Sequence, residues 1–142
     1  MTKLTPHFTF EELTTTNNAD FLAFNQKSAG IIREHIYKLA LFAEQVRAIL
    51  NVPMTITSGF RCPELNDSIG GSPTSQHTKA EAIDFIPGKG MTIDEAFDII
   101  RHSKLVYGQL IKERSGNKQW VHVSMGYKQQ ALTYVDGSYQ AA

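Results

Sequence analysis

Residues 57–85 read TSGFRCPELNDSIGGSPTSQHTKAEAIDF, and this run holds most of the polar motifs of the chain. It starts at the end of MTIT, residues 54–57, whose alternation and β-branched residues predict a strand. It ends in residues 82–86, an apolar segment that predicts a second strand and contains Asp84. A polar loop carrying His77 joins the two strands. Because burying an ionised carboxylate alone is costly, Asp84 needs a partner.

The length and composition of the chain limit its domain count and the classes of protein to which it can belong. A chain of 142 residues fits one domain and can bury a core without disulfides. We expect a single domain over residues 1–142, with a helical part at 1–53, a motif-bearing core at 54–125 and a C-terminal extension at 126–142. The 14 basic and 14 acidic residues give zero net charge, which does not suit a nucleic-acid-binding protein. The lone Cys62 excludes an intrachain disulfide.

The spacing of apolar residues predicts an α+β fold, with a small, mostly antiparallel sheet and helices packed on one side. The predicted helices are a short turn at 8–13 capped by Thr9, a long helix at 31–50, a short helix at 63–69 and a helix at 91–103 capped by Thr92. Two further strands are predicted at 106–112 and 119–125, joined by a polar turn at 113–118. We expect residues 14–30 to be irregular or weakly helical, and residues from 126 onward to pack loosely.

Strand alternation indicates which polar side chains share a face. Within residues 82–86, Asp84 lies on the face opposite its two large apolar neighbours. Within residues 120–124, Trp120 and His122 share one face, and the two valines share the other. The valines belong to the core, so Asp84 and His122 project away from it.

His77, Asp84 and His122 are therefore candidate metal ligands. Two neutral imidazoles and one carboxylate suit Zn²⁺, and three protein ligands leave a fourth position for water, as in catalytic sites. The spacing alone leaves a second interpretation open. In that interpretation His77 is a surface loop residue and His122 is an ordinary strand histidine.

Four motifs in order, SGFRCPELN, GGSPTSQH, AIDF and WVHVS, resemble the zinc D-alanyl-D-alanine carboxypeptidase and L-alanyl-D-glutamate endopeptidase superfamily. Its relatives include phage endolysins, the vancomycin-resistance dipeptidases and the hedgehog amino-terminal domain. The chain is most similar to the single-domain phage and bacterial branch, in which an opening like HFTFEEL also precedes a long helix. The resemblance covers roughly residues 8–125. It implies a hedgehog-type fold with one zinc ion per chain on His77, Asp84 and His122.

The resemblance also implies roles for residues near the metal. Arg61 matches an arginine that binds and polarises the substrate carbonyl; the alternative is a structural arginine that bridges loop carbonyls. Ser75 and Gln76 match a segment that lines the substrate cleft; the alternative is a turn that only positions His77. Trp120 either walls the cleft or packs in the core.

Two positions depart from the usual family pattern. Ala80 stands where relatives usually have glycine, which matters if the position needs a positive φ. Gln119 stands three residues before the last histidine, where several relatives carry an acidic general base. Glu113 is the candidate base, because the most similar branch often has a glutamate in an equivalent Leu-Ile-x-Glu context. A solvated glutamate at the end of a strand is the other interpretation of Glu113.

The resemblance predicts a zinc metallopeptidase that cleaves peptidoglycan stem peptides, in cell-wall lysis or remodelling. It would act as a D-Ala-D-Ala carboxypeptidase or as an L-Ala-D-Glu-type endopeptidase. The alternative, which Gln119 favours, is a catalytically weak or inactive metal-binding module of a cell wall or phage assembly. Residues 1–13 carry no apolar signal core, and no apolar stretch is long enough to cross a bilayer. We expect a monomer without nucleic-acid partners or membrane insertion, made in the cytoplasm of a bacterium or phage-infected cell and acting at the cell wall.

Overall fold

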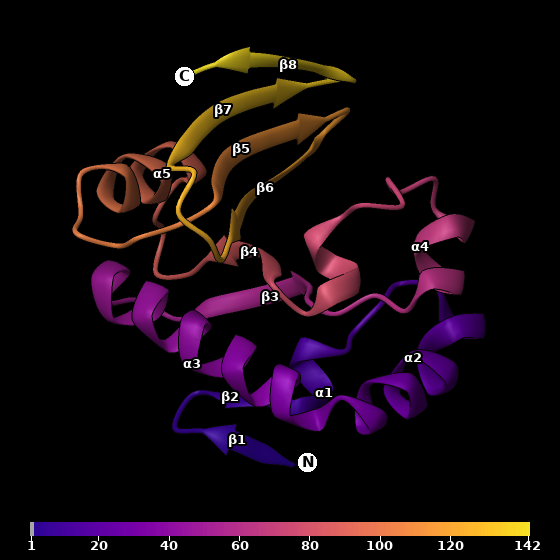
Figure 1. The fold of residues 1–142 in the computed structure, drawn as a ribbon. Coiled ribbons are helices and arrows are strands. Elements are labelled where there is room, and N and C mark those ends of the chain that lie inside the picture. Colours follow the sequence, from indigo (N-terminus) through magenta and orange to yellow (C-terminus); the bar gives the residue numbers. More distant parts are fainter. Residues whose placement is uncertain (1) are drawn as a thin grey trace. The chain divides into compact units, whose positions relative to one another are not determined.

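The computed structural model describes residues 2–142 and confirms the predicted α+β class (Figure 1). The helices are α1 (Phe10–Leu13), α2 (Ala19–Ile31), α3 (Arg33–Leu50), α4 (Pro63–Ser68) and α5 (Ile93–Arg101), with a 3-10 helix η1 (Gln76–Lys79). The strands are β1 (Lys3–Thr5), β2 (Phe8–Thr9), β3 (Met54–Ser58), β4 (Ala82–Pro87), β5 (Gln109–Ser115), β6 (Lys118–Ser124), β7 (Gln130–Val135) and β8 (Ser138–Ala141). Strands β1 and β2 pair antiparallel, and the larger sheet has the order β3-β4-β6-β5-β7-β8. Within residues 2–142, no helix is both long and apolar enough to span a membrane.

The chain divides into two compact units. Unit 1 comprises Met1–Glu44 and Ile56–Ile83, and unit 2 comprises Gln45–Thr55 and Asp84–Ala142. Of the candidate metal ligands, His77 belongs to unit 1, whereas Asp84 and His122 belong to unit 2.

Helix ends in unit 1 follow the predicted capping chemistry. The Thr9 hydroxyl accepts a hydrogen bond from the Glu12 amide at 3.1 Å, and the Glu12 carboxylate accepts one from the Thr9 amide at 3.0 Å. This reciprocal capping box starts α1 where the sequence predicts it. Pro63 begins α4, because a residue without an N–H loses no hydrogen bond in the first turn of a helix. Buried side chains of unit 1 include Phe8, Phe10, Leu13, Ile36, Leu39, Phe60 and Leu65.

Helix α2 is more regular than the sequence predicts for residues 14–30. Its apolar residues do not form one stripe: Leu22 and Phe24 are exposed, whereas the polar Asn25 is fully buried. The Asn25 amide nitrogen donates to the carbonyls of Thr14 at 2.9 Å and Phe60 at 3.0 Å, and its oxygen accepts from the Cys62 amide at 2.7 Å. These tertiary hydrogen bonds hold the helix in place, and no local pattern reveals them.

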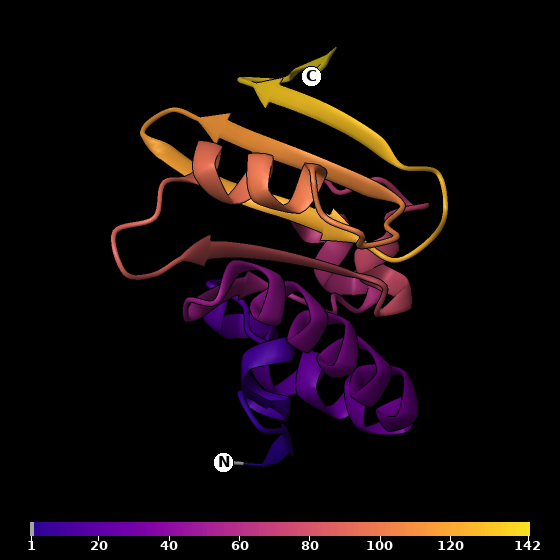
Figure 2. The same ribbon diagram turned by 90° about the vertical axis from the view of Figure 1, so that its left-hand side faces the viewer.

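Helix α5 packs against one face of the sheet in unit 2 (Figure 2). It starts at the predicted cap, where the Thr92 hydroxyl accepts from the Glu95 amide at 3.0 Å. Asp94 forms ion pairs with Lys112 at 3.1 Å and Arg114 at 3.0 Å, both on β5. The face of β5 that carries Lys112 and Arg114 is therefore the face that α5 covers.

The turn between β5 and β6 is shorter than predicted. Residues 113–115 continue β5, so the turn is confined to residues 116–117. Gly116 has a φ of +60°, which suits glycine at a tight turn. As a result, Glu113 lies within the strand and pairs with Trp120 across the hairpin.

Residues from 126 onward, which we expect to pack loosely, form two further strands, although none of their side chains is fully buried. Strand β7 pairs parallel with β5, and β8 pairs antiparallel with β7 at the edge of the sheet (Figure 1). Asp136 and Gly137 join them with φ values of +44° and +95°. Asp-Gly between two β-prone segments is a strong local signal for a hairpin, and it was overlooked because the flanking residues are polar.

Candidate metal centre and catalytic site

His77 is held in unit 1 by hydrogen bonds to its backbone and to its ring. The Ser75 hydroxyl caps η1 and accepts from the His77 amide at 3.2 Å. The His77 side chain is buried, and its Nδ1 lies 2.7 Å from the Gly59 carbonyl oxygen. Because a carbonyl only accepts, Nδ1 carries the proton and Nε2 keeps a lone pair. Such a backbone partner fixes the ring of a metal-binding histidine in this tautomer.

Because Gly59 has no side chain, the backbone can pack closely around it, and this packing positions the Gly59 carbonyl against His77. A Cβ atom at residue 59 would lie 2.4 Å from the Leu13 carbonyl oxygen, so a side chain does not fit there. The next amide, from Phe60, donates to the same oxygen at 2.8 Å, and the Arg61 amide donates to the His77 carbonyl at 3.0 Å. The SGFR segment is therefore bound by backbone hydrogen bonds both to the end of α1 and to η1.

Asp84 and His122 form a close pair within unit 2. The His122 Nδ1 lies 2.8 Å from the Asp84 Oδ1, and the two side chains are 12% and 16% exposed, respectively. Ile83 and Phe85, on either side of Asp84, are fully buried, which fixes the direction of the carboxylate as alternation predicts. Little water is left to solvate the pair, so an ionic or hydrogen-bonded partner is required.

The donor atoms of His77, Asp84 and His122 could hold a metal ion. Two imidazole nitrogens and a carboxylate oxygen form the donor set of catalytic zinc sites. The hydrogen bond from His77 to Gly59 supplies the outer partner that such sites use. The residues present therefore fit a zinc ion.

Glu113 shares the sheet face of the Asp84–His122 pair. In the β5–β6 hairpin, Glu113 lies opposite Trp120 and Ile111 lies opposite His122, so Glu113 and His122 are diagonal neighbours. The Trp120 Nε1 donates a hydrogen bond to the Glu113 Oε2 at 3.1 Å. Gln119 pairs with Arg114 and faces the other way. In this hairpin an acid at position 119 would lie on the face opposite to the Asp84–His122 pair.

The family model described as peptidase M15 matches residues 6–124. The chain belongs to the peptidase M15 family. This confirms the predicted relationship to the D-alanyl-D-alanine metallopeptidase superfamily and its α+β fold. A search of curated proteins gave no match. Strands β7 and β8 lie beyond the matched residues.

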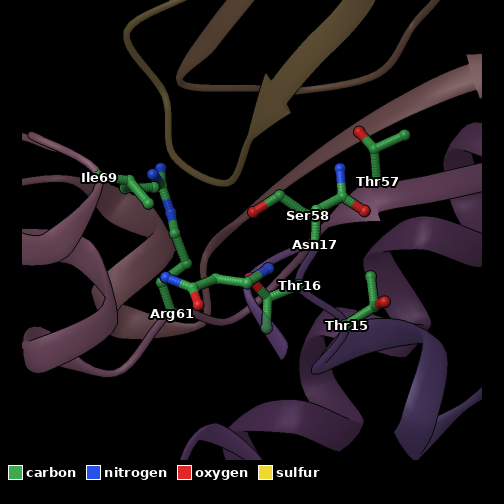
Figure 3. A pocket seen from close by; sticks show the side chains of 8 residues that line it. Thr15, Thr16, Asn17, Thr57, Ser58, Arg61 and Ile69 are labelled. Carbon is green, nitrogen blue, oxygen red and sulfur yellow. The ribbon is translucent and has the colours of Figure 1, made fainter. Parts of the chain in front are cut away.

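Arg61 of this M15 chain borders a pocket within unit 1 that is lined mainly by residues with polar side chains (Figure 3). The pocket has a volume of about 410 Å³ and is lined by Thr15, Thr16, Asn17, Asn18, Thr57, Ser58, Arg61 and Ile69. The Arg61 Nη2 donates to the Ser75 hydroxyl at 3.4 Å. Hydroxyl, amide and guanidinium groups together suit the carbonyls and carboxylate of a peptide.

The other predicted cleft residues have mixed surroundings. Ser75 caps η1 and contacts Arg61, so its hydroxyl holds local structure. Gln76 begins η1 and is half-buried, and its carbonyl accepts from the Glu81 amide at 3.0 Å. Trp120 is half-buried on the face of Glu113. Ala80 ends η1 with φ +56° and ψ +42°, the left-handed conformation for which glycine is preferred.

Sequence analysis missed Asn25 and the Gly59 carbonyl. Asn25 binds the backbone on both sides of Arg61, and Gly59 fixes the tautomer of His77. The partners lie 18 to 37 residues apart in the chain. No local pattern in the sequence marks Asn25, because its burial depends on contacts with residues distant in the chain.

Proposed function

We propose that this M15 chain is a zinc-dependent peptidase that cleaves peptidoglycan stem peptides. Family membership supports a metallopeptidase. The observation that carries the proposal is the position of Glu113, a carboxylate on the same sheet face as the Asp84–His122 pair. A hydrolytic metal site needs a base close to its ligands, and this face provides one.

In this proposal His77, Asp84 and His122 bind one zinc ion. The neutral tautomer of His77 offers Nε2 for binding, and Asp84 contributes a negative charge. Bound zinc would supply Lewis acidity, which polarises the scissile carbonyl and makes water more acidic. Metal binding requires the proton shared between His122 and Asp84 to leave, so affinity should fall in acid.

Glu113 acts as the general base and then as the general acid. Its carboxylate accepts a proton from the attacking water and donates it to the leaving amine nitrogen. The Trp120 hydrogen bond orients the carboxylate for both transfers. Arg61 donates to the substrate oxygen as negative charge develops there, and Ser75 steadies the guanidinium. Gln76 and Trp120 line the cleft.

The substrate is an extended peptide of the cell wall. We infer cleavage either of a terminal D-Ala-D-Ala bond or of an L-Ala-D-Glu bond, with action at the cell wall. The guanidinium of Arg61 and the hydroxyl groups that line the pocket beside it support a ligand with carbonyl or carboxylate groups.

Metal analysis of protein purified without added zinc tests the ligand set. We expect one zinc per chain, and His77→Ala and His122→Ala should lose both zinc and cleavage of wall peptides. His102→Ala is the matched control, because His102 is an exposed residue that ends α5. Activity that survives complete chelation, or a His122→Ala variant with wild-type rates, would show that the mechanism is wrong.

Glu113→Gln tests the base separately from the metal. Glutamine still accepts the Trp120 hydrogen bond but cannot take up a proton, so kcat should fall by about 100- to 10,000-fold while zinc remains bound. Glu34→Gln, at an exposed position of α3, is the control and should keep full activity. If the wild type binds zinc but cleaves no wall fragment, the chain is a binding module instead.

A further inference from the structure

The sheet of unit 2 continues past the end of the family match. The match ends at Ser124, whereas β7 and β8 add two strands beside β5. The residues of this C-terminal hairpin, 130–141, therefore lie outside the part of the chain that the family model describes. Two of them, Tyr134 and Tyr139, carry aromatic rings.

Strand register places both tyrosines in line with the proposed base. Trp120 lies opposite Glu113, Glu113 lies opposite Tyr134, and Tyr134 lies opposite Tyr139. Directly paired residues of neighbouring strands point to the same face of a sheet. These four residues thus form a continuous row across β6, β5, β7 and β8, with Glu113 between aromatic side chains. We call Trp120, Glu113, Tyr134 and Tyr139 the aromatic row.

The two tyrosine rings contact each other and still expose surface. Their centroids are 4.7 Å apart with a tilt of 57° between the ring planes, a favourable aromatic geometry. Tyr134 is half-buried, and Tyr139 is 58% exposed. An exposed, ordered aromatic pair beside a carboxylate offers apolar area at low entropic cost to a ligand.

Tyr139 interacts electrostatically with charged groups of the site. Burial, followed by the negative charges of Glu113, Tyr134 and Asp84, raises the pKa of the Tyr139 phenol above its usual value. Like other tyrosines, Tyr139 is uncharged at neutral pH, so it adds no negative charge beside Glu113. A peptide could approach this part of the face without repulsion from Tyr139.

We propose that Tyr134 and Tyr139 form an aromatic wall of the substrate cleft and contact the peptide beside the bond that Glu113 serves. This inference rests on the proposed peptidase function and deepens it. The ring of Tyr139 supplies the main contact, because it is the more exposed of the two. Alanine methyl groups and peptide planes are the chemistry that an aromatic surface of this kind packs against.

Kinetics of Tyr139→Ala on a synthetic stem peptide, which begins L-Ala-D-Glu and ends D-Ala-D-Ala, test the wall. We expect KM to rise about five-fold, with kcat and zinc content unchanged, because a ring contact is lost but no reacting group is. Tyr139→Phe keeps the ring and should stay within about two-fold of the wild type. Tyr127→Ala is the matched control, since Tyr127 is 89% exposed and precedes β7. A Tyr139→Ala variant with the KM of Tyr127→Ala would overturn the inference, as would a Tyr139→Phe variant as weak as Tyr139→Ala.

A binding assay separates this inference from the proposed function. Trp120 is the only tryptophan and belongs to the aromatic row, so its fluorescence should report peptide bound to zinc-loaded Glu113→Gln protein. Adding Tyr139→Ala should weaken the peptide affinity about five-fold. The wild type could cleave no peptide while Tyr139→Ala still weakens peptide binding as expected. That result would contradict the peptidase proposal and support the aromatic wall. If peptide binds equally with and without the Tyr139 ring, or does not bind at all, the wall is refuted.

Discussion

Ala80 shows how one side chain can carry a cost beside a functional site. Its φ of +56° is unfavourable for any residue with a Cβ, and it follows directly on the 3-10 helix that carries His77. The usual family glycine would remove this strain, although glycine also adds freedom to the unfolded chain.

Ala80→Gly should therefore raise the free energy of unfolding by about 0.5–1 kcal/mol. Urea denaturation of both proteins measures the difference. Ala23→Gly provides the opposite control, because Ala23 is exposed inside α2 and its substitution should cost about 1 kcal/mol. If both substitutions destabilise equally, residue 80 is not strained.

In the proposed mechanism, Trp120 orients Glu113 through its indole N–H. Trp120→Phe keeps an aromatic ring on the sheet but removes the hydrogen bond to Glu113. A hydrogen bond to a charged group contributes more than a neutral one, so kcat should fall about ten-fold while zinc content stays constant. Steady-state kinetics with metal analysis check this. An unchanged kcat would mean that other contacts orient Glu113.

At the scale of elements, α5 is tied to β5 by charge. A hydrogen bond from Lys112, opposed by burial and reinforced by the charges of Lys112 and Arg114, lowers the pKa of Asp94. A carboxylate with a lowered folded-state pKa stabilises the fold at pH values above its unfolded pKa. This contribution is lost as the pH falls through the folded-state pKa. The pair is half-exposed, so solvent screening keeps its contribution small.

Asp94→Asn should lower the free energy of unfolding by about 0.5 kcal/mol at pH 7. Wild type and variant should converge as the pH is lowered through the Asp94 pKa, because protonation removes the charge in the wild type as well. Denaturation curves at several pH values measure this. Asp20→Asn is the control, because Asp20 lies in the first turn of α2. Its substitution measures what the helix dipole contributes to the free energy of unfolding. A difference that persists in strong acid would contradict the charge explanation.

At the scale of the whole molecule, metal binding should contribute to stability. A ligand present at 100 times its Kd adds about 2.7 kcal/mol to the folded state. Chelation should therefore lower the Tm of the wild type by roughly ten degrees. Thermal unfolding with and without chelator measures the shift, and His77→Ala should show no chelator effect. A chelator-insensitive Tm in the wild type would argue against a zinc ion bound to the native fold.

Much of the fold follows from local sequence. Thr9 and Thr92 cap helices where expected, and Pro63 begins a helix, because capping depends on residues within one turn. Helix α2 and the final hairpin were not predicted. Helix α2 depends on the tertiary hydrogen bonds of Asn25. The final hairpin depends on a polar Asp-Gly turn.

The sequence by itself determined the family, the α+β class and the residue types of a metal site, because motif order and alternation are properties of the chain. Only the tertiary structure decided that Glu113, on a different strand, shares the face of the Asp84–His122 pair. The two-residue turn after β5 sets the register that puts Glu113 beside the Asp84–His122 pair and turns Gln119 away from it. A shift of one residue would have reversed both, since side chains alternate between the faces of a sheet.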